Sequence, residues 1–325
     1  MPNVNYQKIC QDLISDLSPR QKDVILERFG LNGGERKTLE AVGESFGVTR
    51  ERVRQIQDGA LEEIKDKTEN YPVVFQNLKK YFQSFGDLKK EDAMLQELGE
   101  EKWQNQIYFL LTLSNGFVRF GANKDFHPLW AAGAASLERA QKTISLLYQK
   151  LEEAKTPLSL KELAKFASQN TPVLESYLEV SKKIQKNSEG VFGLKDWPEI
   201  NPRGVKDKAY LLFKKTQEPL HFTKVANMIE GSLVQTVHNE LIRDPRFILV
   251  GRGMYALKEW GYEPGQVKDV ISRILKNGKK PLSKEEILGK VLEQRIVKEN
   301  TVFLNLNNKK YFSRTPQGKY QIQEA

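Results

Sequence analysis

The sequence lacks the residues that most metal centres and covalent cross-links require. Its 325 residues include one cysteine, Cys10, and three histidines. A single cysteine excludes a disulfide within the chain and agrees with a reducing compartment, so we expect a cytoplasmic protein. The histidines His127, His221 and His238 give no zinc-ligand spacing, and we therefore predict no metal and no other cofactor.

Long apolar runs and enzyme signatures are missing as well. The longest apolar run, residues 108–113, is far too short to span a bilayer, and the first residues contain no basic-then-apolar signal segment. No glycine-rich phosphate loop or nucleophile elbow occurs, and no pair of carboxylates stands in a context for acid–base catalysis. We therefore expect no enzymatic activity, no membrane insertion and no evident small-molecule ligand.

Positive charge is concentrated toward the C-terminal end. The chain has 51 Lys or Arg and 42 Asp or Glu, a net charge of +9. Residues 203–265 hold 10 basic and 7 acidic residues, and residues 266–325 hold 13 and 6, so these segments carry +3 and +7. A basic segment suits a polyanion such as DNA, because each neutralised phosphate releases counterions. An ordinary solvated surface has the same composition, so charge alone leaves both interpretations open.

A run of helix start and stop signals near the N-terminus predicts a helix-turn-helix. Ser18, followed by proline and then glutamine, predicts a helix start with a capping box, and Gly30 predicts the end of that helix. Thr38 is expected to cap a short second helix, Gly47 to form a tight turn with positive φ, and Thr49 to cap a third helix.

The third helix of this unit is expected to have one buried and one exposed face. Apolar residues recur every three or four positions, at Val53, Ile56, Ala60 and Ile64. The opposite side carries, near its N-terminal end, Arg50, Glu51, Arg54 and Gln55. A recognition helix needs this arrangement, because Arg binds guanine and Gln binds adenine through paired hydrogen bonds in the major groove. Any amphipathic helix with a charged solvent face gives the same periodicity, so the pattern alone does not decide.

This segment resembles region 4 of the sigma-70 family. The resemblance covers about 50 residues and is carried by LSPRQ at 17–21, ERFGL at 27–31, TLEAVG at 38–43 and VTRERVRQI at 48–56. It implies recognition of a promoter minus-35 element in double-stranded DNA, and docking on the β-subunit flap of the RNA polymerase core. The resemblance implies base or backbone contacts by Arg50, Glu51, Arg54 and Gln55. The remaining members of the predicted contact set are Arg20, Arg28 and Thr38, near phosphates, together with Thr49 and Arg52.

Two departures limit this resemblance. Where the family usually has a basic helix end, this sequence has Asp58, Glu62 and Glu63, which weaken phosphate contacts there. Gly59 in mid-helix also costs up to ~1 kcal/mol relative to alanine. No aromatic-rich helix of the kind that opens the minus-10 element precedes residue 5 or follows residue 68. The sequence therefore predicts a DNA-binding transcription protein that lacks the promoter-melting region of a complete initiation factor.

The remainder of the chain contains a repeated unit. Pro-Leu pairs recur at 157–158, 219–220 and 281–282, 62 residues apart each time, and glycine-led strands recur at 190, 253 and 318. Each unit is expected to contain a helix, a short strand at the Pro-Leu pair, two helices and two further strands. This order predicts a winged helix.

We predict a mainly α fold with small β wings, in which an N-terminal helix-turn-helix precedes tandem winged-helix repeats. The expected domains are a helix-turn-helix at 1–68, a degenerate winged helix at 70–132, and winged helices at 141–200, 203–265 and 266–325. Residues 203–265 resemble the HARE-type domain of the RNA polymerase delta subunit, on residues 219–222, 237–241, 244–247 and 255–260. In 70–132, the segment 116–120 is expected to be a wing strand, and Trp130 to be the counterpart of Trp197.

The winged-helix resemblance leaves the ligand of these units open, because some winged helices bind DNA and the delta-type domain associates with polymerase. Phosphate contacts are predicted at Arg243, Arg246, Arg252, Lys309, Lys310 and Arg314. The aromatic residues that recur at the strand ends, such as Trp197 and Trp260, are better explained by core packing than by base stacking. We expect His221 and His238 to be structural.

Three functional hypotheses follow from the sequence. The first is a promoter-binding regulator with the sigma-like unit as its reader. The second is a delta-like RNA polymerase accessory protein that acts through protein contacts and binds DNA only weakly. The third is the DNA-targeting part of a restriction or defence system that depends on a separate nuclease.

Overall fold

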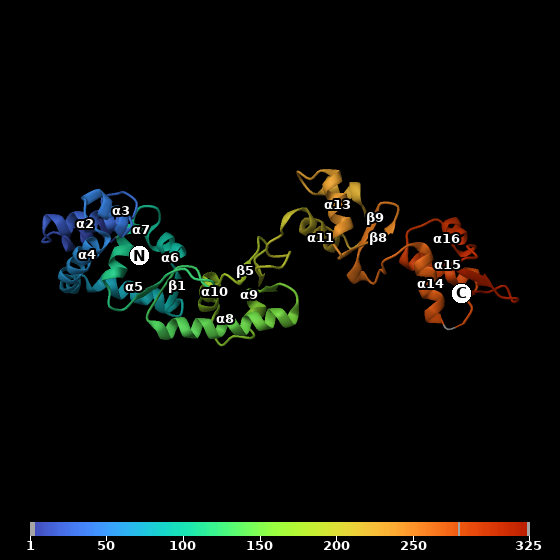
Figure 1. Ribbon diagram of the computed structural model, residues 1–325. Coiled ribbons are helices and arrows are strands. Elements are labelled where there is room, and N and C mark those ends of the chain that lie inside the picture. The colour runs from blue at the N-terminus through green and yellow to red at the C-terminus, as the bar shows by residue number, and fades with distance from the viewer. Residues whose placement is uncertain (1–3, 279, 324–325) are drawn as a thin grey trace. The chain divides into compact units, whose positions relative to one another are not determined.

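The computed structural model describes residues 4–278 and 280–323, and the chain divides into two compact units between Asp196 and Trp197 (Figure 1). Helices dominate both units, and the sheets that they contain are small and antiparallel. The predicted mainly α fold with small β wings is therefore confirmed. None of the helices in the described ranges is long and apolar enough to cross a membrane.

The first unit opens with a helical module, residues 4–68. Its helices are α1 (Tyr6–Leu13), α2 (Pro19–Phe29), α3 (Leu39–Phe46) and α4 (Arg50–Lys65). Ser18 forms the predicted capping box, and Thr38 and Thr49 cap α3 and α4 through their side-chain oxygens. Gly30 and Gly47 end α2 and α3 with φ values of 63° and 65°. The predicted helix boundaries are confirmed because each one has a local capping cause.

Two further segments of the first unit share one order of elements. After the 3-10 turn η1 (Asp66–Asn70), the first repeat comprises α5 (Pro72–Ser84), β1 (Leu88–Lys90), α6 (Glu91–Gly99), α7 (Gln104–Leu113), β2 (Val118–Phe120) and β3 (Leu129–Ala131). The second repeat comprises α8 (Ala134–Ala154), β4 (Leu158–Ser159), α9 (Leu160–Leu163), α10 (Thr171–Val180), β5 (Ile184–Lys186) and β6 (Val191–Leu194). In both repeats the last strand lies in the middle of the sheet.

The second unit contains two more segments with this order. The third repeat comprises α11 (Gly204–Thr216), β7 (Leu220–His221), α12 (Phe222–Met228), α13 (Val234–Arg243), β8 (Phe247–Gly251) and β9 (Met254–Leu257), followed by the 3-10 turn η2 (Lys258–Trp260). The fourth repeat comprises α14 (Val267–Gly278), α15 (Lys284–Gln294), α16 (Glu299–Leu306), β10 (Phe312–Arg314) and β11 (Tyr320–Ile322). A single bridge between Leu282 and Tyr320 stands where the other repeats have their first strand.

The element order predicted for a winged helix is therefore present four times, although some details differ from the prediction. Helix α8 begins at Ala134, before the expected boundary at 141, and residues 197–200 lie in the second unit. Trp130 lies inside β3, whereas Trp197 and Trp260 each stand three residues beyond their last strand. The prediction that Trp130 matches Trp197 is wrong, because the two residues occupy different positions relative to the last strand of their repeats. The Trp130 indole donates a buried hydrogen bond to Glu91 at 3.0 Å.

Helix α7 joins the helical module to the first repeat. Its side chains Ile107, Phe109 and Leu110 are fully buried in one apolar cluster that also contains Ile25 and Phe29 of α2. The rings of Phe29 and Phe109 meet edge to face, with centroids 5.0 Å apart. Because one core draws on both segments, the module and the first repeat bury each other's apolar surface.

A second, much smaller core lies within the helical module. Its fully buried residues are Val24, Val42 and Val53, one from each of α2, α3 and α4, and partly buried side chains pack against them, namely Leu39, Phe46, Val48 and Ile56. Helix α2 therefore separates two cores, with Val24 facing α3 and α4 and with Ile25 and Phe29 facing α7. Because most members of the smaller core are only partly buried, most of the module's apolar stabilisation comes from the shared cluster.

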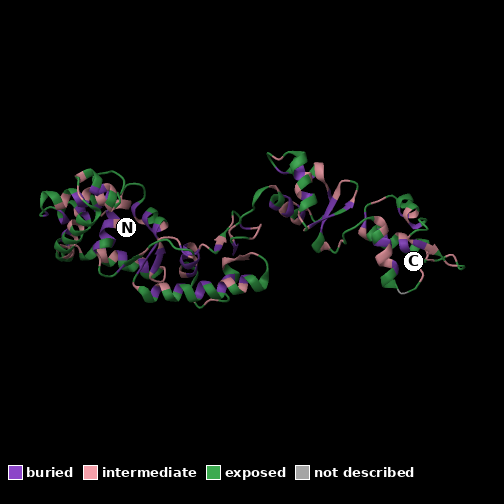
Figure 2. Cartoon of the chain, viewed as in Figure 1, coloured by how far each residue is buried: buried purple, intermediate pink, exposed green. Residues whose placement is uncertain are grey.

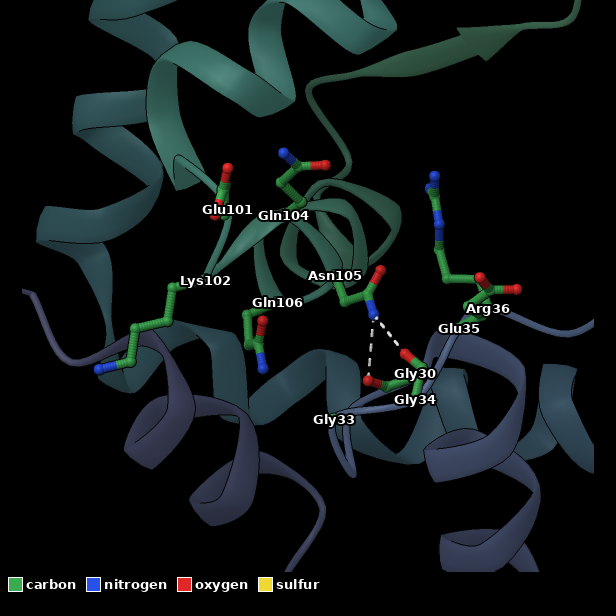
Figure 3. A pocket seen from close by; sticks show the side chains of 10 residues that line it. All are labelled: Gly30, Gly33, Gly34, Glu35, Arg36, Glu101, Lys102, Gln104, Asn105 and Gln106. Atoms are coloured by element: carbon green, nitrogen blue, oxygen red, sulfur yellow. Dashed lines mark hydrogen bonds between the residues drawn. The ribbon is translucent and has the colours of Figure 1, made fainter.

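Polar contacts also tie the module to the first repeat. The Asn105 amide donates to the carbonyl oxygens of Gly30 and Gly34, at 3.1 and 2.9 Å (Figure 3). These bonds hold the loop between α2 and α3 beside a hollow of about 610 Å³ whose other wall is the α6–α7 connection. The ring of Tyr108 lies 4.1 Å beneath the Arg36 guanidinium, which adds a cation–π contact across the same joint.

The second repeat packs on the first through its own third helix, α10. The Ser176 hydroxyl donates to the Leu88 carbonyl oxygen at 2.6 Å, and the Tyr177 hydroxyl donates to the Gly86 carbonyl oxygen at 3.2 Å. Helix α8 closes the repeat with its buried residues along one side and its outer side exposed (Figure 2). The third helices of both repeats in the first unit are thus covered by protein.

We predict that Asn105→Ala lowers the free energy of unfolding of the first unit by about 1–3 kcal/mol, because the joint loses two hydrogen bonds and the Gly30 carbonyl oxygen keeps only the Gly33 amide as a donor. Thermal and urea unfolding of the full chain measure the change. Asn70→Ala, at an exposed site, is the matched control and should stay within about 0.5 kcal/mol of the wild type. Equal stability of the two variants would contradict a structural role for Asn105.

Candidate nucleic-acid interface

Helix α4 presents a polar face away from the two cores to which the helical module contributes. Val53, Ala60 and Ile64 are buried, as their periodicity predicts. The predicted base-contacting side chains are exposed together on the opposite side, namely Arg50, Glu51, Arg54 and Gln55. The α4 side chains that face solvent are thus those that a recognition helix would direct into a major groove.

Arg54 is held in place by carboxylates of its own helix. Its guanidinium donates two hydrogen bonds to Glu51, at 3.0 and 2.7 Å, and a third to Asp58 at 2.6 Å. All three side chains are at least half exposed. These contacts lower the pKa of Glu51 through its hydrogen bonds with Arg54, and they raise the pKa of Arg54. Exposed ion pairs contribute little to stability, so DNA can displace the carboxylates from Arg54.

The other cations near the start of α4 are less constrained. The Arg50 side chain donates no hydrogen bond to another described residue. Arg52 donates to the Gln55 side-chain oxygen at 3.2 Å, one turn along the helix. Thr49 uses its hydroxyl to cap α4, accepting from the Arg52 backbone amide at 3.2 Å. Arg50 is therefore the cation on this face that meets a ligand without first giving up a partner.

Three residues predicted to lie near phosphates already have structural partners. Arg20 donates to the Phe46 carbonyl oxygen at 3.2 Å and lies 4.4 Å above the Phe46 ring, which fixes α2 against α3. Arg28 donates to the Gln57 side chain at 3.1 Å, and its partial burial lowers its pKa. Thr38 caps α3. Arg20 remains exposed, whereas the partly buried Arg28 orders the module from within.

Gly43 and Gly59 have different roles in the module. A Cβ atom at Gly43 would lie 2.6 Å from the Val48 carbonyl oxygen, so α3 approaches the turn before α4 more closely than any side chain allows. The same atom at Gly59 would meet nothing within 4 Å. Gly43 is required by packing, and Gly59 only weakens the middle of α4.

The distal half of α4 is acidic, as the sequence indicated. Asp58 and Glu62 are exposed, and Glu63 accepts a hydrogen bond from the Gln21 amide of α2 at 3.1 Å. From the sequence, Asp58 was predicted only to weaken phosphate contacts, and its ion pair with Arg54 was not predicted. Its position four residues after Arg54 is the spacing at which helical side chains pair, and this signal could have predicted the contact.

In the third repeat, Arg246 has a structural role that the sequence did not reveal. Its guanidinium donates to Asp244 and to Asp207 of α11, the latter at 2.8 Å, and these hydrogen bonds raise its pKa. It also lies 4.6 Å above the Tyr210 ring. We therefore leave Arg246 out of any phosphate-contact surface. Arg243 and Arg252 are exposed, and their predicted phosphate contacts stay predictions.

Aromatic and histidine side chains of the third repeat pack together. Phe222 stacks on His238 with ring centroids 4.2 Å apart, and His221 caps α12 through its Nδ1 atom. Tyr255 is buried, and the half-buried Trp260 packs against the same core. These positions support packing roles. Across residues 4–278 and 280–323, no group of three or more His, Cys, Asp or Glu is placed to hold a metal ion.

The fold and the exposed face of α4 together define a helix-turn-helix module. Residues 13–66 match the family described as "Sigma-70, region 4", and they form a domain of that family. The predicted resemblance to this region is confirmed for these residues. The match covers α2, α3 and α4 with the turns between them.

Individual sigma factors show the same similarity. The chain is 47% identical over 60 residues to RNA polymerase sigma factor SigA1 of Synechococcus elongatus, which covers 18% of this chain and 15% of that protein. It is 46% identical over 63 residues to sigma factor RpoS of Coxiella burnetii, covering 19% and 18%. It is 48% identical over 63 residues to sigma factor sigB of Arabidopsis thaliana, covering 18% and 11%. The chain thus spans less than a fifth of the length of these relatives.

We predict opposite effects from alanine at the two glycines. Gly59→Ala should raise the free energy of unfolding by ~0.5–1 kcal/mol, because alanine has the higher helix propensity and the site is open. Gly43→Ala should lower it by ~1–3 kcal/mol, because its methyl group overpacks the turn. Urea unfolding followed by circular dichroism measures both. A neutral Gly43→Ala variant would mean that α3 and α4 can separate freely.

Proposed function

We propose that this protein is a non-catalytic DNA-binding transcription protein that recognises a promoter minus-35-type element and modulates initiation by RNA polymerase. The observation that carries the proposal is the sigma-70 region 4 domain whose reading helix, α4, exposes Arg50, Arg54 and Gln55 on one face. Arg and Gln are the side chains that discriminate guanine and adenine in the major groove. Occupancy is the mechanism: the protein stabilises polymerase at chosen promoters or blocks a sigma factor there.

The RNA polymerase core is the proposed protein partner, with the β flap as the contact that the region 4 resemblance suggests. In residues 4–68 no large apolar side chain is exposed, because α1, α2 and α4 bury theirs against one another and against α7. A polymerase contact on this module therefore has to be polar in character. Charged side chains give orientation and association rate more than affinity, so such a contact would be salt-sensitive.

We further propose that the four repeats are winged helices, at 70–132, 141–200, 203–265 and 266–325, and that the third is of the HARE type. The shared order of elements and the shared sheet order in three of them support this proposal. Covered third helices in the first unit favour a spacer role for the first two repeats, since a helix buried in protein cannot enter a groove.

A delta-like polymerase accessory protein is the second candidate. The acidic residues Asp58 and Glu62 on the distal half of α4 favour it, because they repel DNA phosphates. The deciding experiment is fluorescence anisotropy of the full chain on a duplex with a minus-35-type element and on a scrambled duplex, at about 150 mM salt. A preference of ~10³-fold or more supports promoter recognition, and equal weak binding supports the accessory function.

Arg54→Ala should reduce affinity for the minus-35-type duplex by roughly five- to 150-fold while leaving affinity for the scrambled duplex nearly unchanged. The physical reason is the loss of a paired hydrogen bond to a base edge. Anisotropy titrations on both duplexes measure the effect. Lys22→Ala, on α2, is the control. Equal losses on both duplexes would show that Arg54 contacts only the backbone.

Asp58→Asn should strengthen binding of the full chain to either duplex by roughly two- to fivefold at low salt, as expected for one surface charge. The substitution removes a negative charge from the proposed DNA-facing side, and the neutral amide oxygen accepts a weaker hydrogen bond from Arg54 than the carboxylate does. The matched variant Asp23→Asn, at an exposed position of α2, should have no effect. Unchanged affinity for Asp58→Asn would mean that DNA does not approach the second half of α4.

A further inference from the structure

The third helices of the repeats differ in what covers them. In the first two repeats, α7 and α10 are each about half made of buried residues, and both lie against other parts of the first unit. In the fourth repeat, α16 buries only Val302 and Leu306. The exposed side chains at its start and middle are Glu299, Asn300, Thr301 and Leu304, and most of α16 is exposed or half-buried (Figure 2).

Positive charge surrounds this open helix. Lys309 and Lys310 are exposed in the connection that follows α16, and Arg314 is exposed on β10. Lys319 directly precedes the return strand β11, whose first residue, Tyr320, pairs with Arg314. The Lys284 amine lies 3.6 Å from the centroid of the Phe303 ring on α16. The cations of the fourth repeat therefore lie at the end of α16, beside it and along the β10–β11 hairpin.

Lys309, Lys310 and Arg314 form no ion pair in the described part of the fourth repeat. Lys319 differs from them, because it lies near Glu286 and, after the hydrogen bonds from Ser283, helps to lower the pKa of that carboxyl. Across residues 266–278 and 280–323, Arg273 is the cation found in an ion pair, with Glu263. The contrast with the third repeat is direct, because Arg246 there is neutralised by Asp207 and Asp244. The Arg314 guanidinium makes a hydrogen bond to the Gly318 carbonyl oxygen, which orients the side chain and leaves its charge uncompensated.

We propose that the fourth repeat is a second, sequence-independent site for duplex DNA, in which Lys309, Lys310 and Arg314 bind backbone phosphates beside α16. Phosphate binding by unpaired cations releases counterions and needs no base contact. Duplex DNA is the favoured polyanion because, if the proposed function holds, α4 binds the same molecule. A second site on one polymer then raises the local concentration of the first.

The test compares the full-length wild type with Lys309→Gln/Lys310→Gln/Arg314→Gln on the minus-35-type and scrambled duplexes, at several salt concentrations. Loss of three phosphate contacts should reduce the slope of log affinity against log salt by about 2–3. Affinity at about 50 mM salt should fall at least tenfold for both duplexes, with their ratio unchanged. Lys124→Gln/Lys161→Gln/Lys165→Gln removes the same charge from exposed sites of the first unit and should change the slope little.

The outcomes separate this proposal from the proposed function. A wild type without sequence preference, whose salt slope still falls in the triple variant, supports the second site and contradicts promoter recognition. An unchanged slope and affinity overturn the second site, whatever the preference of α4. Retained DNA binding with lost binding to purified RNA polymerase core also overturns it, because the cations would then serve an acidic protein surface. Circular dichroism checks that the triple variant is folded. The Lys309→Gln/Lys310→Gln double variant, which alters only the loop after α16, provides a second test that does not change β10.

Discussion

The burial of α7 is the constraint on which the first unit depends. An apolar helix of ten residues inserts between the helical module and the sheet of the first repeat, and it supplies Ile107, Phe109 and Leu110 to the largest core there. The module's own smaller core has three fully buried valines, with partly buried side chains packed around them, and on its own it buries too little area to offset the conformational entropy of some sixty ordered residues. Helix α4 therefore also depends on Ala60 and Ile64, which pack into the shared cluster.

The third helices of the repeats differ in the same respect, namely in how far neighbouring protein covers them. A third helix that is buried in a neighbour stabilises the array and loses access to ligands, as α7 and α10 do. A third helix that stays exposed keeps that access but contributes less to the core, as α16 does with two buried residues. Packing and recognition compete for one helix face. In the first unit the third helices α7 and α10 are covered, whereas the polar face of α4 remains exposed.

Local signals made much of this fold predictable from sequence. Helix starts could be predicted at Ser18, Thr38 and Thr49, because capping depends on neighbours within three residues. The equal spacing of the Pro-Leu pairs predicted the repeats. Contacts between distant residues could not be predicted in this way. The clamp of Asn105 on the α2–α3 loop joins positions about 70 residues apart, and Arg246 meets an aspartate 39 residues earlier. The contacts of Arg54 could be predicted only in part. Its partners lie within about one helical turn, so their spacing makes the contacts possible, but spacing does not determine which side-chain rotamers form them.

The shared core also controls the chemical reactivity of Cys10, which is buried in it. The thiol is 2% exposed, and burial raises its pKa to about 12, so the nucleophilic thiolate is scarce at neutral pH. The thiol lies in the cluster that only an intact α1–α7 joint can form. Oxidants and alkylating agents thus reach it mainly through opening of that joint. Modification of this single cysteine therefore reports on the opening of the joint, and a bulky adduct formed there would keep α1 and α7 from packing together again.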